Sequence, residues 1–372
     1  MTYLAPSVET RGSNLALANV RAHLQADKLY LIVLFALLLA WGTLVFGVYQ
    51  SVEAPPIQGT ERAERFALRL VKRTFIFGIA LLVIRFIQHE MAKTGTSFVD
   101  NIKSELAQRP HAYAFHLAFF ALAAVSFSYL QTNFMSLKTT IPEIVPFYLD
   151  PAARAWDLAI FGKDPWLYFE GVYDNALFMN LIDKLYMWWA ALVAGFWVWA
   201  LCSRRMERQR RYQYIFAMVL VWFIAGNVLA TLLSSVGPVY YAEFFADADA
   251  FAALTANLEQ ANAALGGNLR AVNYQEYLLY YYYNPETRFA GISAIPSLHV
   301  ATTLMMLFLF WRTRIAREVL IAYNLVIYCG SIILGWHYGV DGLISVPIAL
   351  ACWWLGGKMA QAIERRSPPV PS

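Results

Sequence analysis

Residues 29–49 read LYLIVLFALLLAWGTLVFGVY, a run without a single charged side chain. A helix needs about 20 mostly apolar residues to cross the hydrocarbon core of a bilayer, so this run predicts a membrane-spanning helix. Further apolar stretches follow it along the chain. Together they predict an all-α fold, a polytopic membrane bundle of about eight spans at about 29–49, 74–91, 112–131, 184–202, 214–236, 298–312, 318–336 and 341–357.

The composition agrees with a chain that is embedded in a bilayer. Of its 372 residues, 59% are apolar and 15% are charged, whereas soluble domains are roughly 45–50% apolar and about 25% charged. This excludes a disordered chain, a disulfide scaffold and an ordinary soluble enzyme. The net charge of +4 is too small to indicate a nucleic-acid partner. The three cysteines lie in apolar stretches, so we expect neither a disulfide framework nor a metal knuckle.

The basic residues predict which face of the bundle is cytoplasmic. Lys and Arg gather after span four (204–211), after span six (312–317) and in the C-terminal tail (358–366). These three places lie on one side of an eight-span bundle, and cytoplasmic loops carry the excess of Lys and Arg. The basic segment 62–73 would fall on the opposite side. Either it forms an amphipathic helix at the interface, or the first two spans are placed wrongly.

The spans also suggest a division of the chain. We expect an N-terminal tail with spans one and two in 1–110, the six remaining spans in 111–358 and a cytoplasmic tail in 359–372. The six-span part contains two long extracytoplasmic segments, 132–183 and 237–297, and segments of this length are often functional. Within the second, 249–266 predicts a surface helix that forms a lid, and YQEYLLYYYY at 274–283 is typical of an interfacial aromatic belt.

Three short motifs stand at the ends of spans. Residues 235–241 (SVGPVYY) end span five, residues 291–299 (GISAIPSLH) lead into span six, and residues 335–341 (GWHYGVD) join span seven to span eight. Spans five and seven run outward and span six begins outside. All three motifs are therefore predicted to meet at the extracytoplasmic face.

The motifs carry residues suited to phosphate chemistry. His337 and Asp341 lie on one helical face if the helix continues through them, and the carboxylate would then fix the imidazole tautomer. His299 follows Pro296 and Ser297, where a proline can start a helix and a helix N-terminus can bind an anion. Two histidines, a carboxylate and an anion site suggest phosphoryl transfer through a phosphohistidine, with one His as nucleophile and the other as general acid.

IPSLH at 295–299 followed by HYGVD at 337–341 resembles the type-2 phosphatidic acid phosphatase (PAP2) superfamily. More narrowly, it resembles the branch with the inositol phosphorylceramide synthases and many bacterial relatives. The resemblance covers about 112–357, which implies that the six spans in 111–358 form the catalytic six-helix core. The stretch 150–166 resembles the segment that precedes the catalytic core in that branch. It implies a multi-pass protein of the bacterial inner membrane that acts at the extracytoplasmic face on a lipid with a phosphate or phosphodiester headgroup.

The resemblance also implies roles for particular residues. His337 would be the nucleophile and Asp341 its activating partner, while His299 would protonate the leaving group and then activate the acceptor. Ser297 and nearby backbone N–H groups would bind the phosphate. No cofactor and no metal are implied. We place five residues in substrate or phosphate binding: Ser297, Arg288, Tyr240, Tyr241 and Trp336.

The sequence departs from the family pattern in its cations. The first motif of the family supplies Lys and Arg before a proline, but 237–241 holds no basic residue. Ser331 stands where the classical phosphatases have an Arg six residues before the histidine. Because charge-assisted hydrogen bonds to phosphate are about twice as strong as neutral ones, another cation should substitute. Arg288 is the first candidate, followed by Lys163, Arg154 and Arg270.

Several functions remain open at this stage. Water as acceptor would make the protein a lipid phosphatase, and a hydroxyl of a ceramide, glycerolipid, sugar or inositol would make it a phosphotransferase. The long extracytoplasmic segments favour transfer, since they can exclude water. A membrane transporter or scaffold without catalytic activity is the alternative from another class of function. The intact His299, His337 and Asp341 argue against it. These three side chains could also bind zinc, although the sequence offers no tight two-ligand spacing. The oligomeric state is not indicated.

Overall fold

The computed structural model describes residues 8–52, 110–203, 206–247, 249–284 and 290–369. All regular secondary structure in these ranges is helical, which confirms the predicted all-α class. Within them, five helical stretches are long and apolar enough to span a membrane, and Leu298–Leu309 is a shorter apolar helix. The protein is therefore an integral membrane protein. The five stretches are Leu24–Val48, Ala176–Cys202, Arg208–Leu232, Arg314–Ile333 and Gly339–Glu364.

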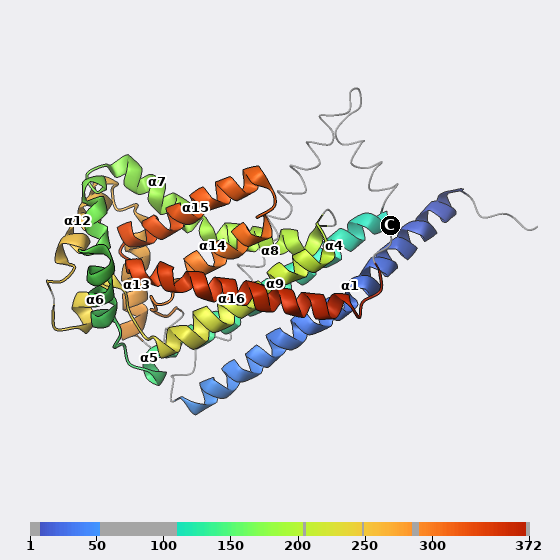
Figure 1. The fold of residues 1–372 in the computed structure, drawn as a ribbon, viewed down its shortest axis with the longest axis horizontal. Helices are drawn as coiled ribbons and strands as arrows, with labels where there is room; N and C mark the ends of the chain where they lie inside the picture. The colour runs from blue at the N-terminus through green and yellow to red at the C-terminus, as the bar shows by residue number, and fades with distance from the viewer. Residues whose placement is uncertain (1–7, 53–109, 204–205, 248, 285–289, 370–372) are drawn as a thin grey trace, which may run out of the picture.

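The spans form a bundle around one central helix (Figure 1). Helix α9 (Arg208–Phe223) packs against α1, α4, α8, α14 and α16. Most side chains of α9 are buried, and the aromatic rings of Trp197 and Trp222 are among the largest fully buried groups. The other bundle helices are α1 (Val8–Ser51), α4 (Pro110–Thr139), α8 (Trp189–Cys202), α14 (Leu298–Leu309), α15 (Arg314–Ile333) and α16 (Gly339–Glu364).

The basic cluster after span four ties helices together at one end of this bundle. Arg208 forms an ion pair with Glu364 at 2.6 Å, between its Nη2 and a carboxylate oxygen. Arg210 donates to the carbonyls of Phe308 and Leu309 at the end of α14. These contacts join the start of α9 to the ends of α14 and α16, so these arginines contribute to helix packing.

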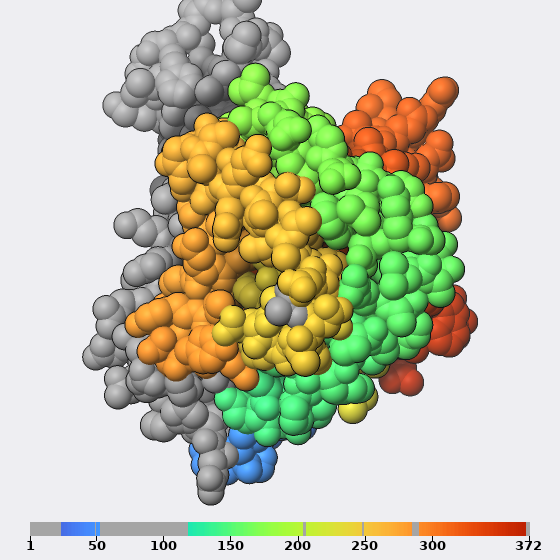
Figure 2. Space-filling model, turned by 90° about the vertical axis from the view of Figure 1, so that its left-hand side faces the viewer, coloured from blue at the N-terminus to red at the C-terminus, as the bar shows by residue number. Residues whose placement is uncertain are grey.

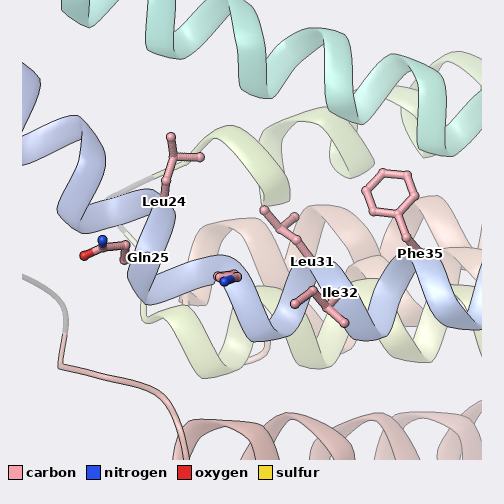
Figure 3. A pocket seen from close by; sticks show the side chains of 6 residues that line it. Leu24, Gln25, Leu31, Ile32 and Phe35 are labelled. Carbon is pink, nitrogen blue, oxygen red and sulfur yellow. The ribbon is translucent and has the colours of Figure 1, made fainter.

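An apolar surface hollow of about 420 Å³ lies along α1 near this end (Figure 3). It is lined by Leu24, Gln25, Lys28, Leu31, Ile32 and Phe35. None of the predicted site residues borders it.

The opposite end of the bundle is covered by short helices from the two long segments (Figures 1 and 2). The segment predicted as a surface helix forms α12, and the tyrosine-rich run lies in α13 with Tyr274, Tyr277, Tyr280 and Tyr283 exposed. The covering elements are α5 (Ile141–Ile144), α6 (Asp150–Phe161), the 3-10 helix η1 (Pro165–Val172), the 3-10 helix η3 (Pro238–Tyr240), α11 (Tyr241–Phe244), α12 (Ala252–Ala264) and α13 (Arg270–Tyr283), while α7 (Ala176–Met187) leads from this end into the span that α8 completes.

Several boundaries differ from the predicted spans. The span predicted at 214–236 ends at Leu232, after a π-helix η2 (Ile224–Leu229) and a short α10 (Ala230–Leu232). In η2, the buried Asn227 accepts a hydrogen bond from the Trp41 indole and donates to the Phe134 carbonyl, so it joins three helices. The span predicted at 184–202 begins earlier, at Ala176. Helix α16 continues to Glu364, into the predicted tail. The predicted span 74–91 and the basic segment 62–73 lie outside the described residues.

Candidate active site

The structure brings the three predicted motifs together at the covered end of the bundle. The backbone N–H of Ala294 donates to the Ser235 carbonyl at 3.1 Å, and that of Ile295 donates to the Ser235 hydroxyl at 2.9 Å. Gly237 has a φ of +94°, and a Cβ there would lie 2.5 Å from the Trp336 carbonyl oxygen. Only glycine combines this backbone conformation with so close an approach. The first motif therefore contacts both of the others.

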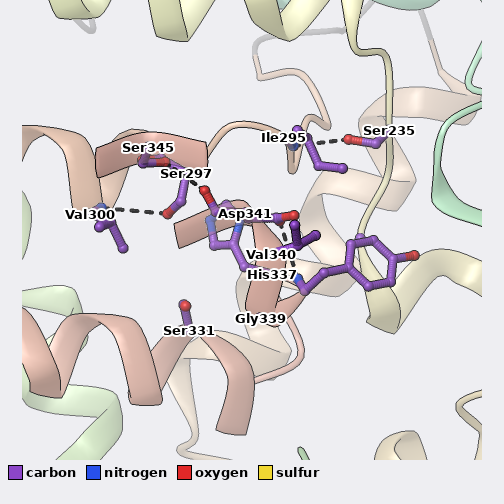
Figure 4. Close-up of polar contacts among 12 residues, drawn as sticks. Ser235, Ile295, Ser297, Val300, Ser331, His337, Gly339, Val340, Asp341 and Ser345 are labelled. Carbon is purple, nitrogen blue, oxygen red and sulfur yellow. Dashed lines mark hydrogen bonds and ion pairs between the residues drawn. The ribbon is translucent and has the colours of Figure 1, made fainter. Parts of the chain in front are cut away.

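His337 and Asp341 form a buried pair at the start of α16 (Figure 4). His337 Nδ1 lies 2.9 Å from Asp341 Oδ2, which also accepts the backbone N–H of Tyr338 at 3.1 Å. The helix begins only at Gly339, so the pair belongs to the N-terminal cap of α16 and not to one continuous helical face. Besides Asp341, the backbone of Ala294 in the second motif also forms a hydrogen bond with the His337 ring.

His299 lies in the first turn of α14, with its ring centroid 6.0 Å from that of His337. Two aromatic rings flank it: Tyr186 stacks at 4.7 Å, and Trp189 lies at 4.0 Å. The Trp189 indole is held by a hydrogen bond to Thr302 Oγ1 at 2.8 Å. Sequence reasoning missed both rings, since nothing in their spacing links them to His299. Among the described residues, no group of three His, Cys, Asp or Glu side chains is placed to hold a metal ion.

Ser297 is the N-cap residue of α14, so the helix begins one residue after it and not at Pro296. Its hydroxyl accepts the Val300 N–H at 3.5 Å, and its carbonyl accepts a hydrogen bond from Ser345 Oγ. Ser345 also donates to the Asp341 carbonyl, which joins the starts of α14 and α16. Figure 4 shows these residues close to His337. The helix N-terminus beside His299 is the type of group that binds an anion.

Two buried aspartates of α6 hold the motif backbones, and sequence reasoning missed them too. Asp150 accepts the N–H groups of Val236 and Gly237, the latter at 2.8 Å, and the hydroxyl of Tyr338 at 2.9 Å. Asp157 accepts the N–H groups at the first two positions of α16, at 2.8 and 2.7 Å. Burial raises the pKa of Asp157 to about 7, although these two donors oppose the shift. The two carboxylates stand seven residues apart, a spacing that places them on one face of a helix. This spacing was the feature of the sequence that could have indicated a shared role.

The aromatic residues predicted to bind substrate lie beside the motifs. The Tyr240 hydroxyl donates to the Gln275 carbonyl at 3.0 Å, so it is engaged with α13. Its ring contacts Trp336 edge to face at 6.5 Å. Tyr241 packs against Phe251. These contacts place the three residues in the wall between the motifs and the covering helices.

The predicted phosphate-binding cations do not gather at the histidines. Arg154 bonds Asp164 and Asp247, Lys163 lies over the Tyr168 ring, and the backbone of Arg270 donates to Asp183. Arg288 lies outside the described residues. A different cation, Lys138 at the end of α4, has its backbone packed against Gly291 in the loop that leads to His299, and its charge adds to burial in lowering the pKa of His337.

This fold and site define a class: an integral membrane protein that buries two histidines and a carboxylate beneath short covering helices. The model of the PAP2 superfamily matches residues 153–355, more than half of the chain. The chain therefore belongs to the PAP2 superfamily, and this membership supports a phosphatase-type lipid phosphoesterase. No curated protein and no solved structure matches the chain.

Proposed function

We propose that this protein cleaves a lipid phosphoester through a phosphohistidine on His337 and passes the phosphoryl or phospho-headgroup to a hydroxyl acceptor. The observation that carries the proposal is the arrangement of three side chains. Asp341 lies 2.9 Å from Nδ1 of His337, and the His299 ring lies 6.0 Å from the His337 ring. A phosphate between two imidazoles at this separation can contact both through hydrogen-bond distances of about 3 Å.

In the first half-reaction, Nε2 of His337 attacks phosphorus and a P–N bond forms. The bond between phosphorus and the lipid oxygen breaks, and that oxygen takes a proton from His299 as the lipid alcohol leaves. Asp341 stabilises the positive charge that develops on the His337 ring. Burial and the charge of Lys138 lower the pKa of His337, which keeps its imidazole neutral and therefore nucleophilic.

In the second half-reaction, His299 takes the proton of the acceptor hydroxyl as the acceptor oxygen attacks phosphorus. The P–N bond breaks and its electron pair returns to His337. The enzyme regains its starting protonation state, and the product is the phosphorylated acceptor. With water as acceptor, the product is phosphate or the free phosphorylated headgroup.

A hydroxyl acceptor is supported by the burial of the site. His337 is 6% exposed and Asp341 is fully buried, and His299 lies between two aromatic rings. Exclusion of water protects a reactive intermediate from hydrolysis. The resemblance to the inositol phosphorylceramide synthase branch points the same way. The placement of Arg residues after span four and in the tail supports a site at the extracytoplasmic face.

Turnover by the purified protein tests this proposal. Phosphatidic acid, an isoprenyl phosphate and phosphatidylinositol are offered as donors, with and without ceramide as acceptor. His337→Ala should lose at least about 10³-fold in kcat, the scale of removing an activated nucleophile, whereas Ser331→Ala should stay near wild type. Among the described residues, the Ser331 hydroxyl donates to the Tyr328 carbonyl of its own helix. Undiminished turnover by His337→Ala would contradict the proposal and favour another mechanism. No turnover of any donor by the wild type would favour a transporter or scaffold without catalytic activity.

A further inference from the structure

We propose that Lys138 binds the substrate phosphate and takes the place of the cations that the first and third motifs lack. The inference rests on the proposed function, because it assigns a role within the same site. Lys138 lies in the last turn of α4. It is also the sole Lys or Arg between residues 110 and 153.

The end of α4 is packed directly against the loop that leads to His299. A Cβ on Gly291 would lie 2.3 Å from the Lys138 carbonyl oxygen and 3.0 Å from the next backbone nitrogen. Two backbones can approach this closely only at glycine. The loop from Gly291 to His299 therefore has its position set by the residue that carries the ammonium group.

The side chain of Lys138 lies against the same wall as His299. Its ammonium stands 5.7 Å from the centroid of the Phe134 ring, one helical turn earlier. A Cβ on Gly226 would touch both the Phe134 ring and Leu298, the neighbour of His299. Phe134 also meets Trp222 edge to face at 4.9 Å. The lysine stem is thus held beside the start of α14.

The ammonium of Lys138 has no carboxylate partner among the described residues, and its contact is the Phe134 ring. Two of the other cations near the covering helices are engaged, Arg154 with two aspartates and Lys163 with Tyr168. Lys138 lies beyond the span predicted at 112–131, and burial lowers its pKa to about 8. A partly buried cation without a counter-charge is costly, and a bound phosphate supplies that charge.

The charge of Lys138 also reaches His337, where it adds to burial in lowering the pKa of the imidazole. A phosphate that contacts both imidazoles would lie within the field of this ammonium. Its negative charge would offset the repulsion between the lysine and a histidine that becomes protonated. The Lys138 ammonium would therefore stabilise a phosphate bound between His299 and His337.

Binding of inorganic orthophosphate tests this role without any need for turnover. The full-length protein in detergent is heated in phosphate or in chloride at equal ionic strength, and the midpoint of unfolding is followed. Lys138→Met keeps the stem over Phe134 and removes the charge. It should need about tenfold or more phosphate to reach the same stabilisation, the scale of one charge-assisted hydrogen bond. Lys138→Arg should recover most of the shift.

Lys358→Met is the matched control. Lys358 also lies one helical turn after an aromatic residue, with its ammonium 5.6 Å from the Trp354 ring centroid, at the far end of the bundle. The Lys358→Met variant should respond to phosphate like the wild type. A Lys138→Met response equal to that of Lys358→Met, or no response of the wild type, would overturn the inference. Loss of turnover in His337→Ala is measured separately, so failure of the phosphate site and failure of the proposed function are distinguishable.

Discussion

Replacing Asp157 with Asn should reduce both stability and turnover, since this carboxylate holds the start of α16 beside His337. Its two oxygens accept the N–H groups of Gly339 and Val340 at 2.8 and 2.7 Å. The side chain is buried, so water cannot replace a lost bond. At pH 8, above its pKa of about 7, the group is ionised and also faces the positive end of the helix dipole.

The magnitude follows from these contacts. The Asn side chain has one oxygen that can accept one of the two N–H groups, and its NH₂ group would face the other N–H. That buried N–H donor is left without an acceptor, which costs about 1–3 kcal/mol. Burial raises the pKa of Asp157 to about 7 in spite of its two donors, so loss of the charge itself adds no further cost. The unpaired donor therefore predicts a loss of about 1–3 kcal/mol. Because a small misplacement of a reacting group can cost about 10²-fold, kcat should fall at least about tenfold.

Asp183→Asn provides the matched comparison. Asp183 is equally buried and accepts the N–H groups of Arg270 and Ala271 at 3.1 and 2.9 Å, at the start of α13. The assay is thermal unfolding and turnover of both variants in the same detergent at pH 8. Both should lose similar stability, but only Asp157→Asn should lose kcat. Equal kcat values in the two variants would refute the idea that Asp157 positions His337.

Three further predictions concern the same site. Gly237→Ala should destabilise the protein by at least about 2 kcal/mol, since positive φ and overpacking each cost about 1–3 kcal/mol; a melting curve checks this. Trp189→Ala should lower kcat more than Trp189→Phe does, since only Ala removes the ring that lies 4.0 Å from His299. The pKa of His337 is lowered in the folded protein. As pH falls, the His337 imidazole is therefore protonated in the unfolded chain before it is protonated in the folded protein. Stability from this group is therefore complete above about pH 6.5 and is lost as pH falls toward the folded pKa. Unfolding measured from pH 5 to 8 should show this slope, and His337→Asn should flatten it.

The spans and the three motifs could be predicted from the sequence because their signals are local. A long apolar run predicts a membrane helix wherever it occurs. The spacing of His337 and Asp341 predicts a contact within one turn, which the structure contains at 2.9 Å. The order and direction of the spans alone predicted that the three motifs meet at one end of the bundle. The condition for a shared helical face, a helix that continues through His337, is not met, because α16 begins only at Gly339.

The supporting residues could not be predicted because their contacts are distant in sequence. Asp157 binds backbone groups more than 180 residues later in the chain. Its seven-residue spacing from Asp150 indicates a shared helical face but not these remote partners. Lys138 lies near the end of a helix, where a lysine is usually solvated. The ring of Trp189 reaches His299 only because α8 passes beside α14. Such contacts depend on helix packing, which the apolar pattern leaves open.

Identification of the phosphorylated residue tests the central claim most directly. Protein is mixed with a lipid donor labelled in its phosphate, quenched within milliseconds under alkaline conditions that preserve phosphohistidine, and digested for mass spectrometry. His299→Ala is treated in parallel, because loss of the base that activates the acceptor should let the intermediate accumulate. The account predicts label on His337 that disappears when acceptor is added to the wild type. Label on another residue, or steady turnover by His337→Ala, would contradict it.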